Sequence, residues 1–175
     1  MSHVFALPGF DLDAFVAATL AEDLGDEGDV TSAAVIPADA MFAGVMDSRD
    51  AITVAGLPIA EVPGTDLMRL RGRARALLTA ERPALNTVQH LSGIATMTRA
   101  YVDAIAGTGA TLLDTRKTLP GLRRLEKYAT RMGGATNHRM GLWDAAMIKD
   151  NHVAVAGSVA EAARGEGAPP AGGRG

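Results

Sequence analysis

The sequence predicts an α/β fold, because short apolar strands alternate with amphipathic helices in its second half. A buried strand is predicted at 111–113, and a helix begins near Thr118 and stops at Gly133. A second strand is predicted at 145–148, and Ser158 begins a short last helix. Strand, helix, strand and helix in this order are typical of parallel βα units.

The first predicted element along the chain is a helix over residues 11–24, whose apolar side chains recur at helical spacing. Asp11 or Asp13 caps its start, and Gly25 ends it. An acidic turn at 25–32 follows this helix and leads directly into β-like segments.

Two short strands are predicted at 41–48 and 51–57, where turn residues separate the β-like segments. The stretch 58–75 is weakly patterned. The longest helical signal then runs over 79–105, with apolar residues at three- and four-residue steps.

This long predicted helix contains two unusual positions. Pro83 is tolerated because it falls in the opening turn. Ser92 and Gly93 interrupt the pattern, which predicts a kink or a close backbone approach. The buried face of the following helix is predicted to consist of Leu122, Leu125, Ala129 and Met132.

The composition is that of a globular protein, since 47% of the 175 residues are hydrophobic and 21% are charged. This length accommodates one domain or two small ones. The absence of cysteine excludes a disulfide scaffold, a thiolate nucleophile and a cysteine-ligated zinc or iron–sulfur site. No apolar run approaches the roughly 20 residues of a membrane span. Residues 1–15 lack the basic start and long apolar stretch of a signal peptide, so a cytoplasmic protein is expected.

The net charge of −3 hides an uneven distribution of charge along the chain. Residues 11–50 carry ten acidic side chains and one basic one, whereas residues 114–139 carry seven basic and two acidic ones. The basic stretch focuses positive potential where an anion can dock. It lacks the interleaved aromatic residues of nucleic-acid-binding proteins, and no nucleic acid is expected as a partner. A solvated helix face is the preferred interpretation for Arg123, Arg124, Lys127 and Arg131.

Polar residues follow both predicted strands of the second half at the point where each strand ends. The carboxyl ends of parallel strands are where α/β folds build their sites. A lysine directly after Met147-Ile148 therefore emerges at the mouth of such a site. The residues placed in this way are Arg116, Lys117, Lys149 and Asn151.

Three segments form a long, ordered pattern: ERPALNTVQHLSGIAT (81–96), LLDTRKTLPGLRRLEKYA (112–129) and GGATNHRMGLWDAAMIKDNH (133–152). Together with AEDLGDEGDVTS (21–32), this pattern closely resembles the quinolinate phosphoribosyltransferase family, the carboxylating nicotinate-nucleotide pyrophosphorylases. The resemblance implies an α+β, sandwich-like N-terminal part. The first βα units of an incomplete parallel α/β barrel would follow it.

The resemblance also implies a reaction of NAD biosynthesis, in which the ring nitrogen of quinolinate attacks C1 of phosphoribosyl pyrophosphate. Pyrophosphate leaves with the assistance of Mg²⁺, the 2-carboxylate departs as CO₂, and nicotinate mononucleotide forms. Guanidinium groups suit the two adjacent carboxylates of quinolinate, because they bind carboxylates bidentately. Lysine ammonium groups suit the phosphates. Positioning and charge stabilisation then lower the barrier without a protein nucleophile.

By the same resemblance, Arg116 and Arg139 bind the carboxylates of quinolinate, with His138 beside them. Thr115 and Lys117 line the same pocket. An alternative for His138 is a loop histidine that is bonded to the backbone. His138 and His152 are not spaced as zinc ligands on one helix, so no zinc is predicted, and no residue of this chain is assigned as a metal ligand.

Lys149 would contact the substrate near the transferring centre, which makes it a candidate catalytic residue together with Lys117. Arg82 occupies the family position that reaches into the neighbouring subunit's site, so a homodimer is implied; the alternative is that Arg82 holds a helix start. His152 is assigned to structure, and Asp150 to orienting Lys149 rather than to binding metal.

The chain departs from the family pattern in two places. The segment between 57 and 77 is shorter than in the family, within a predicted N-terminal domain over 1–108. The resemblance stops at the end of two predicted barrel units over 109–163, and the Gly/Pro-rich tail over 164–175 is predicted to be disordered. The family's acidic groups for ribose and Mg²⁺ and its glycine-rich phosphate loop are expected beyond that point. Turnover by this chain alone is therefore not expected.

Three functions are compatible with this pattern. The first is quinolinate phosphoribosyl transfer, with the barrel completed by another chain or by a longer gene product. The second is a catalytically inactive remnant that acts at most as an anion-binding or dimerising module. The third is a related transferase for a different aromatic acid, but the NHR and IKDNH segments favour the quinolinate enzyme.

Overall fold

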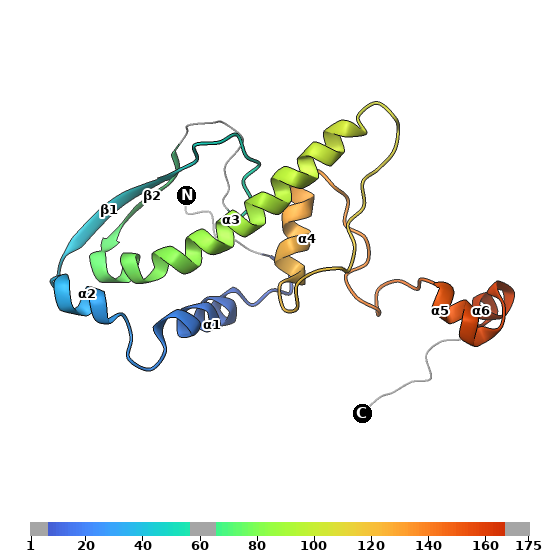
Figure 1. The fold of residues 1–175 in the computed structure, drawn as a ribbon, viewed down its shortest axis with the longest axis horizontal. Helices are drawn as coiled ribbons and strands as arrows, with labels where there is room; N and C mark the ends of the chain where they lie inside the picture. Colours follow the sequence, from blue (N-terminus) through green and yellow to red (C-terminus); the bar gives the residue numbers. More distant parts are fainter. Residues whose placement is uncertain (1–6, 57–65, 167–175) are drawn as a thin grey trace. The chain divides into compact units, whose positions relative to one another are not determined.

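The computed structural model describes residues 7–56 and 66–166 (Figure 1). The chain divides into two compact units, residues 1–138 and residues 139–175, and each is described by itself. The elements of the first unit are α1 (Leu12–Leu24), α2 (Val30–Val35), β1 (Met41–Asp47), β2 (Asp66–Arg73), α3 (Ala74–Ala104) and α4 (Arg123–Met132). Those of the second unit are α5 (Asp150–Ala156) and α6 (Val159–Glu166).

Local capping sets the limits of α1, and this part of the sequence prediction is confirmed. Asp11 Oδ1 accepts a hydrogen bond from Ala14 N at 2.9 Å. At the other end Gly25 adopts a φ of 51°, which favours glycine, and the helix stops there.

The predicted acidic turn at 25–32 is wrong in its second half, because α2 begins inside it. Asp29 caps α2 by accepting a hydrogen bond from Ser32 N at 2.8 Å. At the end of α2, Arg75 Nε donates to the Ile36 carbonyl at 2.8 Å. Since Arg75 belongs to α3, part of what stabilises α2 comes from a distant segment.

β1 and β2 form an antiparallel pair in which Val45 lies opposite Arg69. The predicted strand at 41–48 is confirmed as β1, whereas β2 falls in the stretch that the sequence leaves weakly patterned. The predicted shortening between 57 and 77 falls partly on residues 57–65, which lie outside the described residues.

Residues 51–56 form no strand, so the predicted strand over 51–57 is wrong. The amides of these residues bind side chains of neighbouring helices instead of a neighbouring strand. Ala55 N donates to Ser92 Oγ at 3.2 Å, and Gly56 N donates to Tyr128 OH at 3.3 Å. These contacts provide the main-chain amides with the hydrogen-bond acceptors that a neighbouring strand would otherwise provide.

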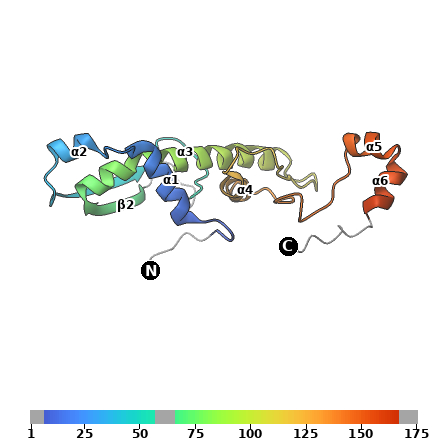
Figure 2. The same cartoon turned by 90° about the horizontal axis from the view of Figure 1, so that it is seen from below.

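α3 runs along the length of the first unit in both views (Figures 1 and 2). It begins at Ala74 rather than at Thr79, so Pro83 lies inside the helix and not in its opening turn. The helix continues through Ser92 and Gly93, where an interruption is predicted. Ser92 is buried and bonded to the 51–56 segment, which agrees with a close backbone approach.

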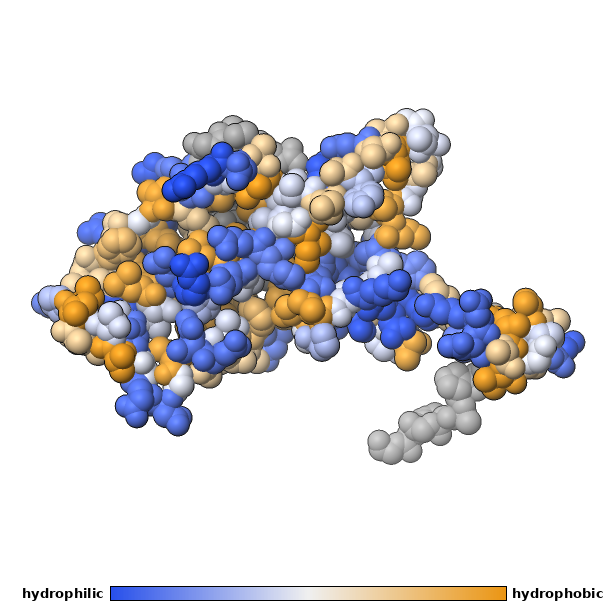
Figure 3. All heavy atoms as spheres, viewed as in Figure 1, coloured by the Kyte–Doolittle hydropathy of each residue, from blue (hydrophilic) through white to orange (hydrophobic). Residues whose placement is uncertain are grey.

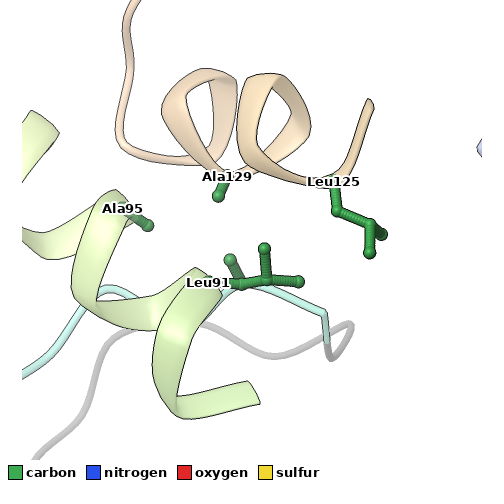
Figure 4. Close-up of a cluster of buried hydrophobic side chains, with 5 residues drawn as sticks. Leu91, Ala95, Leu125 and Ala129 are labelled. Atoms are coloured by element: carbon green, nitrogen blue, oxygen red, sulfur yellow. The ribbon is translucent and has the colours of Figure 1, made fainter. Parts of the chain in front are cut away.

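The core of the first unit lies between α3 and α4 (Figure 4). Its buried members are Ala55, Leu91, Ala95, Leu125 and Ala129. Small side chains let the two helices approach closely, and a Cβ added to Gly133 would lie 2.4 Å from Ala95 O. Met132, which is predicted on the buried face, is 40% exposed.

The predicted parallel strands are reduced to one bridge within the described parts of the chain. Leu113 pairs with Thr136 in parallel, and Leu113 is 50% exposed rather than buried. Residues 145–148 form no strand. The Ala145 carbonyl accepts a hydrogen bond from Arg139 Nη1 at 2.7 Å instead of from a strand partner.

The second unit buries little of its own surface, and among its described residues Gly141 alone is buried. Leu142 and Trp143 are 71% and 78% exposed. The predicted last helix is confirmed as α6, which includes residues 164–166 of the predicted disordered tail. The rest of that tail, 167–175, lies outside the described residues.

The face of the molecule in Figure 3 carries hydrophobic side chains among hydrophilic ones. In the first unit, Val16, Phe42 and Val45 are 44%, 46% and 53% exposed. Within the described ranges, no helix has the length and apolar character needed to cross a membrane.

Candidate active site

Asp114 lies where three segments of the first unit meet. Its carboxylate is almost fully buried and forms an ion pair with Lys127 of α4, whose side chain is 1% exposed. It also accepts hydrogen bonds from Asn137 Nδ2 at 2.6 Å and from His138 N at 2.7 Å. One carboxylate therefore ties the 114–118 loop both to α4 and to the segment that carries His138.

The position of Lys127 corrects the interpretation of the basic stretch as a solvated helix face. Lys127 is buried, Arg123 Nε donates to Thr118 Oγ1 at 3.2 Å, and Arg124 Nη1 donates to a main-chain carbonyl that precedes α1. Arg131 is exposed, in agreement with the interpretation. The difference arises because α4 packs against other parts of the chain on more than one side.

Arg116 projects from the loop that Asp114 anchors. Its Nε is buried and donates to no acceptor among the described residues. The loop is shaped by local hydrogen bonds, since Lys117 N donates to Thr115 Oγ1 at 3.0 Å and Thr118 N donates to Arg116 O at 3.0 Å. A guanidinium donor that finds no acceptor in the described part of the chain is available to a bound anion.

Thr115, Arg116 and Lys117 follow Asp114 directly in the chain, and the main-chain N of His138 donates to the Asp114 carboxylate. Arg82 is exposed on α3. In the part of the chain that the structure describes, no hydrogen bond or ion pair connects Arg82 to the Asp114 loop. Its role in a neighbouring subunit's site stays a prediction.

Arg139 belongs to the second unit, where its guanidinium holds the Ala145 carbonyl. The Asp144 carboxylate accepts hydrogen bonds from Met140 N at 2.7 Å and from Gly141 N at 3.2 Å. The hydrogen bond from Met140 N, supported by those from other main-chain amides and by the charge of Arg139, lowers the pKa of Asp144 below its ordinary value. These contacts shape the turn that follows Arg139.

Lys149 is exposed at the start of α5, and its main-chain N donates to His152 Nδ1 at 2.9 Å. His152 thereby caps α5, which agrees with its assignment to structure. Arg139 and Lys149 belong to one unit, and Arg116 and His138 belong to the other. Their convergence on one quinolinate molecule therefore stays a prediction.

An apolar cavity of about 290 Å³ is lined by residues of α1, the sheet, α3 and α4. Its walls include Leu12, Phe15, Met68, Val88 and Leu91. Burying an ionised carboxylate among such side chains is costly, so this cavity does not suit a diacid.

The described residues contain no group of three or more His, Asp or Glu side chains that could hold a metal ion. They therefore do not offer a donor set that fits the Mg²⁺ implied by the family resemblance. Mg²⁺ prefers several oxygen ligands in octahedral geometry.

The sequence predicts no role in the site for Asp114, Lys127 or Asn137. Asp114 and Asn137 adjoin candidate residues in the DTRKT and NHR segments, and this adjacency is the signal that points to them. Lys127 offers no local signal, because a lysine in a basic helix ordinarily faces solvent.

Two family models match the chain. The quinolinate phosphoribosyl transferase N-terminal domain matches residues 60–92, and the C-terminal domain of the same family matches residues 94–167. Among curated proteins, the nicotinate-nucleotide pyrophosphorylase [carboxylating] of Mycobacterium leprae is 48% identical over 169 residues, which cover 83% of this chain and 60% of that protein. The quinolinate phosphoribosyltransferase [decarboxylating] 1b of Nicotiana tabacum is 40% identical over 179 residues, covering 90% of this chain and 51% of that protein. The chain thus spans between about half and three fifths of the length of these relatives.

Solved structures are also similar to this chain. NadC from Streptococcus pyogenes matches with a TM-score of 0.84 and 37% identity, over 93% of this chain and 65% of that one. Nicotinate-nucleotide pyrophosphorylase from Ehrlichia chaffeensis matches with a TM-score of 0.83 and 32% identity, over 90% of this chain and 65% of that one. These similarities confirm the predicted α/β fold class. Since two models of one family and relatives of 40–48% identity agree, the chain belongs to the quinolinate phosphoribosyltransferase family.

Proposed function

We propose that this chain carries the quinolinate-binding part of a phosphoribosyltransferase of NAD biosynthesis. The ring nitrogen of quinolinate forms a bond to C1 of phosphoribosyl pyrophosphate, and the bond from C1 to pyrophosphate breaks. The 2-carboxylate then leaves as CO₂, and the electron pair left on C2 is protonated, which gives nicotinate mononucleotide. The observation that carries the proposal is the Arg116 guanidinium, whose buried Nε has no acceptor among the described residues, on a loop anchored by Asp114.

The side chains of the chain have separate roles in this proposal. Arg116 and Arg139 bind the two carboxylates of quinolinate, because a guanidinium presents two parallel donors to a carboxylate. Thr115 and His138 lie beside them, and Lys117 adds positive charge to the same loop. The negative charge that develops on the ring as CO₂ leaves is stabilised by these fixed cations.

The remaining roles extend to the second unit and to a second subunit. Lys149 contacts the substrate near the transferring centre. Arg82 is donated to the site of a partner subunit in a homodimer, which its exposure on α3 permits. Because the described residues offer no donor set for Mg²⁺, the quinolinate-binding proposal includes no step on a metal ion.

Calorimetric titration of the chain with quinolinate tests the proposal without requiring turnover. Arg116→Ala is expected to weaken quinolinate binding by about 30- to 4000-fold, since a buried charged pair loses one partner. Arg131→Ala is the matched control, because Arg131 is an exposed arginine of α4 in the same unit. Nicotinate, which has a single carboxylate, is expected to bind more weakly than quinolinate. Equal quinolinate affinity in the Arg116→Ala variant and the wild-type chain would remove Arg116 from the site and overturn the proposal.

A further inference from the structure

The pairing between residues 112–114 and 136–138 stops after one parallel bridge. Thr136 N donates to Leu112 O at 2.9 Å, and Asp114 N donates to Thr136 O at 3.2 Å. In a regular parallel ladder the next hydrogen bond would run from His138 N to the main-chain carbonyl of Asp114. His138 N donates instead to Asp114 Oδ1 at 2.7 Å. A side-chain oxygen therefore takes the place of the main-chain carbonyl at the point where the two segments separate.

The Asp114 carboxylate is held in place from several directions. The Lys127 ammonium pairs with Oδ1, and Asn137 Nδ2 donates to Oδ2 at 2.6 Å. Thr130 Oγ1 of α4 lies 3.4 Å from Oδ2. Both charged side chains are nearly inaccessible to water, at 3% for Asp114 and 1% for Lys127. Hydrogen bonds that involve a charged group are shorter and stronger than neutral ones, so these contacts hold the carboxylate in one position.

The same residue controls the start of the candidate binding loop. Asp114 is followed directly by Thr115, Arg116 and Lys117, so its backbone sets the direction in which that loop leaves the bridge. Its carboxylate sets the direction in which the chain leaves at His138. Because the hydrogen bond from His138 N to the main-chain carbonyl of Asp114 is absent, the two segments diverge after the bridge. The Asp114 carboxylate still connects them through its hydrogen bond from His138 N.

We propose that Asp114 is a positioning residue for the quinolinate site, with Lys127 as its charge partner. It acts by fixing the main chain at His138 relative to the loop that carries Arg116. This inference rests on the proposed function, because Arg116 and His138 are the groups that it places.

The test compares two double variants of the full chain that differ only in the acceptor at position 114. Asp114→Asn combined with Lys127→Met removes both buried charges but keeps a side-chain oxygen for His138 N. Asp114→Ala combined with Lys127→Met removes both charges and the oxygen. Neither variant leaves an unpaired buried charge, so both are expected to fold. The measurements are hydrogen exchange at the His138 amide without ligand, and calorimetric affinity for quinolinate.

The His138 amide is expected to exchange at least about tenfold faster in the alanine double variant than in the asparagine one, and quinolinate is expected to bind it about tenfold more weakly. Equal exchange in the two variants overturns the proposal. Faster exchange with equal quinolinate affinity makes Asp114 a structural residue only and also overturns it. If the alanine double variant does not fold, the single variant Asp114→Glu, which keeps Lys127, is compared with the wild-type chain instead. The added methylene moves the carboxylate away from His138 N, so faster exchange of the His138 amide and weaker quinolinate binding are again expected. A wild-type chain that binds no quinolinate overturns the proposed function, while the exchange comparison still decides whether Asp114 fixes the main chain at His138.

Discussion

His90 Nε2 on α3 lies 3.0 Å from Glu126 Oε1 on α4. The other carboxylate oxygen, Glu126 Oε2, accepts a hydrogen bond from Leu119 N at 3.2 Å. Glu126 is buried, so one side chain connects the two helices of the core with the loop that precedes α4. That loop begins at the candidate site residues, and the stability of α4 and the shape of the site therefore depend on shared contacts.

Glu126→Ala is expected to lower the free energy of unfolding by about 1–3 kcal/mol, because it removes a buried side chain together with its contacts to His90 and to the Leu119 amide. Urea unfolding of the chain measures this change. Glu81→Ala removes an exposed acidic side chain from α3 and is the control. If both variants unfold at the same urea concentration, the Glu126 contacts do not stabilise the fold.

Gly133→Ala is expected to destabilise the chain by about 1–3 kcal/mol, because the added methyl would overlap the Ala95 carbonyl at 2.4 Å. Gly93→Ala is the matched control, since a Cβ at Gly93 meets nothing within 4 Å. Replacing this glycine inside α3 is expected to raise stability by about 0.5–1 kcal/mol. Thermal unfolding of both variants checks the prediction. A shift of the same sign in the two variants would contradict the close approach of α3 and α4.

Leu91→Ala is expected to cost about 2–5 kcal/mol, because it opens a cavity between α3 and α4. Leu91 is 2% exposed and packs in the cluster that includes Leu125. Met97→Ala is the control on the same helix, where the side chain is 62% exposed. Urea unfolding distinguishes them, and similar losses in the two variants would mean that the core lies elsewhere.

The stability of the first unit is expected to depend on Asp29 in acid. Hydrogen bonds from Ser32, the largest cause, and from Thr79 lower the pKa of Asp29 below its ordinary 3.8. A carboxyl with a lowered pKa in the folded chain contributes stability above its unfolded pKa and loses it as pH falls through its folded pKa. Unfolding experiments from neutral pH to below about pH 3 should therefore show a loss of stability that is smaller in Asp29→Asn.

Thr79→Val provides a second check on Asp29, because it removes one donor and keeps the carboxylate. The acid-dependent loss in this variant is expected to lie between those of the wild-type chain and Asp29→Asn. A pH profile of Asp29→Asn that matches the wild-type profile would exclude Asp29 as a source of the acid sensitivity.

The sequence predicts those elements whose limits are set locally. Asp11 and Gly25 lie next to the ends of α1, and both features are readable from the neighbouring residues. α2 is not predictable in this way, because Arg75 of α3 binds the carbonyl at its end. Residues 51–56 resemble a strand in composition, but Ser92 and other side chains of the helices take their amides. For α2 and for residues 51–56, a tertiary contact overrides the local pattern.

The candidate site is predictable to a similar extent. The DTRKT and NHR segments identify Arg116 and His138, and the structure places both on segments anchored by Asp114. The buried Lys127 could not be predicted, since helical spacing identifies one apolar face and α4 is buried on more than one. The ion pair needs Asp114 and Lys127 to be brought together by the bridge at Leu113 and by the packing of α4.

Trp143 is the single tryptophan of the chain, and it lies largely exposed in the second unit. Its fluorescence therefore reports on the exposed surroundings of position 143. Far-ultraviolet circular dichroism reports mainly on the first unit, because most of the described helical residues belong to α1, α2, α3 and α4. Variants of the α3–α4 core are expected to move the dichroism transition, whereas the emission maximum of Trp143 is expected to change little on unfolding, because this side chain is already 78% exposed in the folded chain.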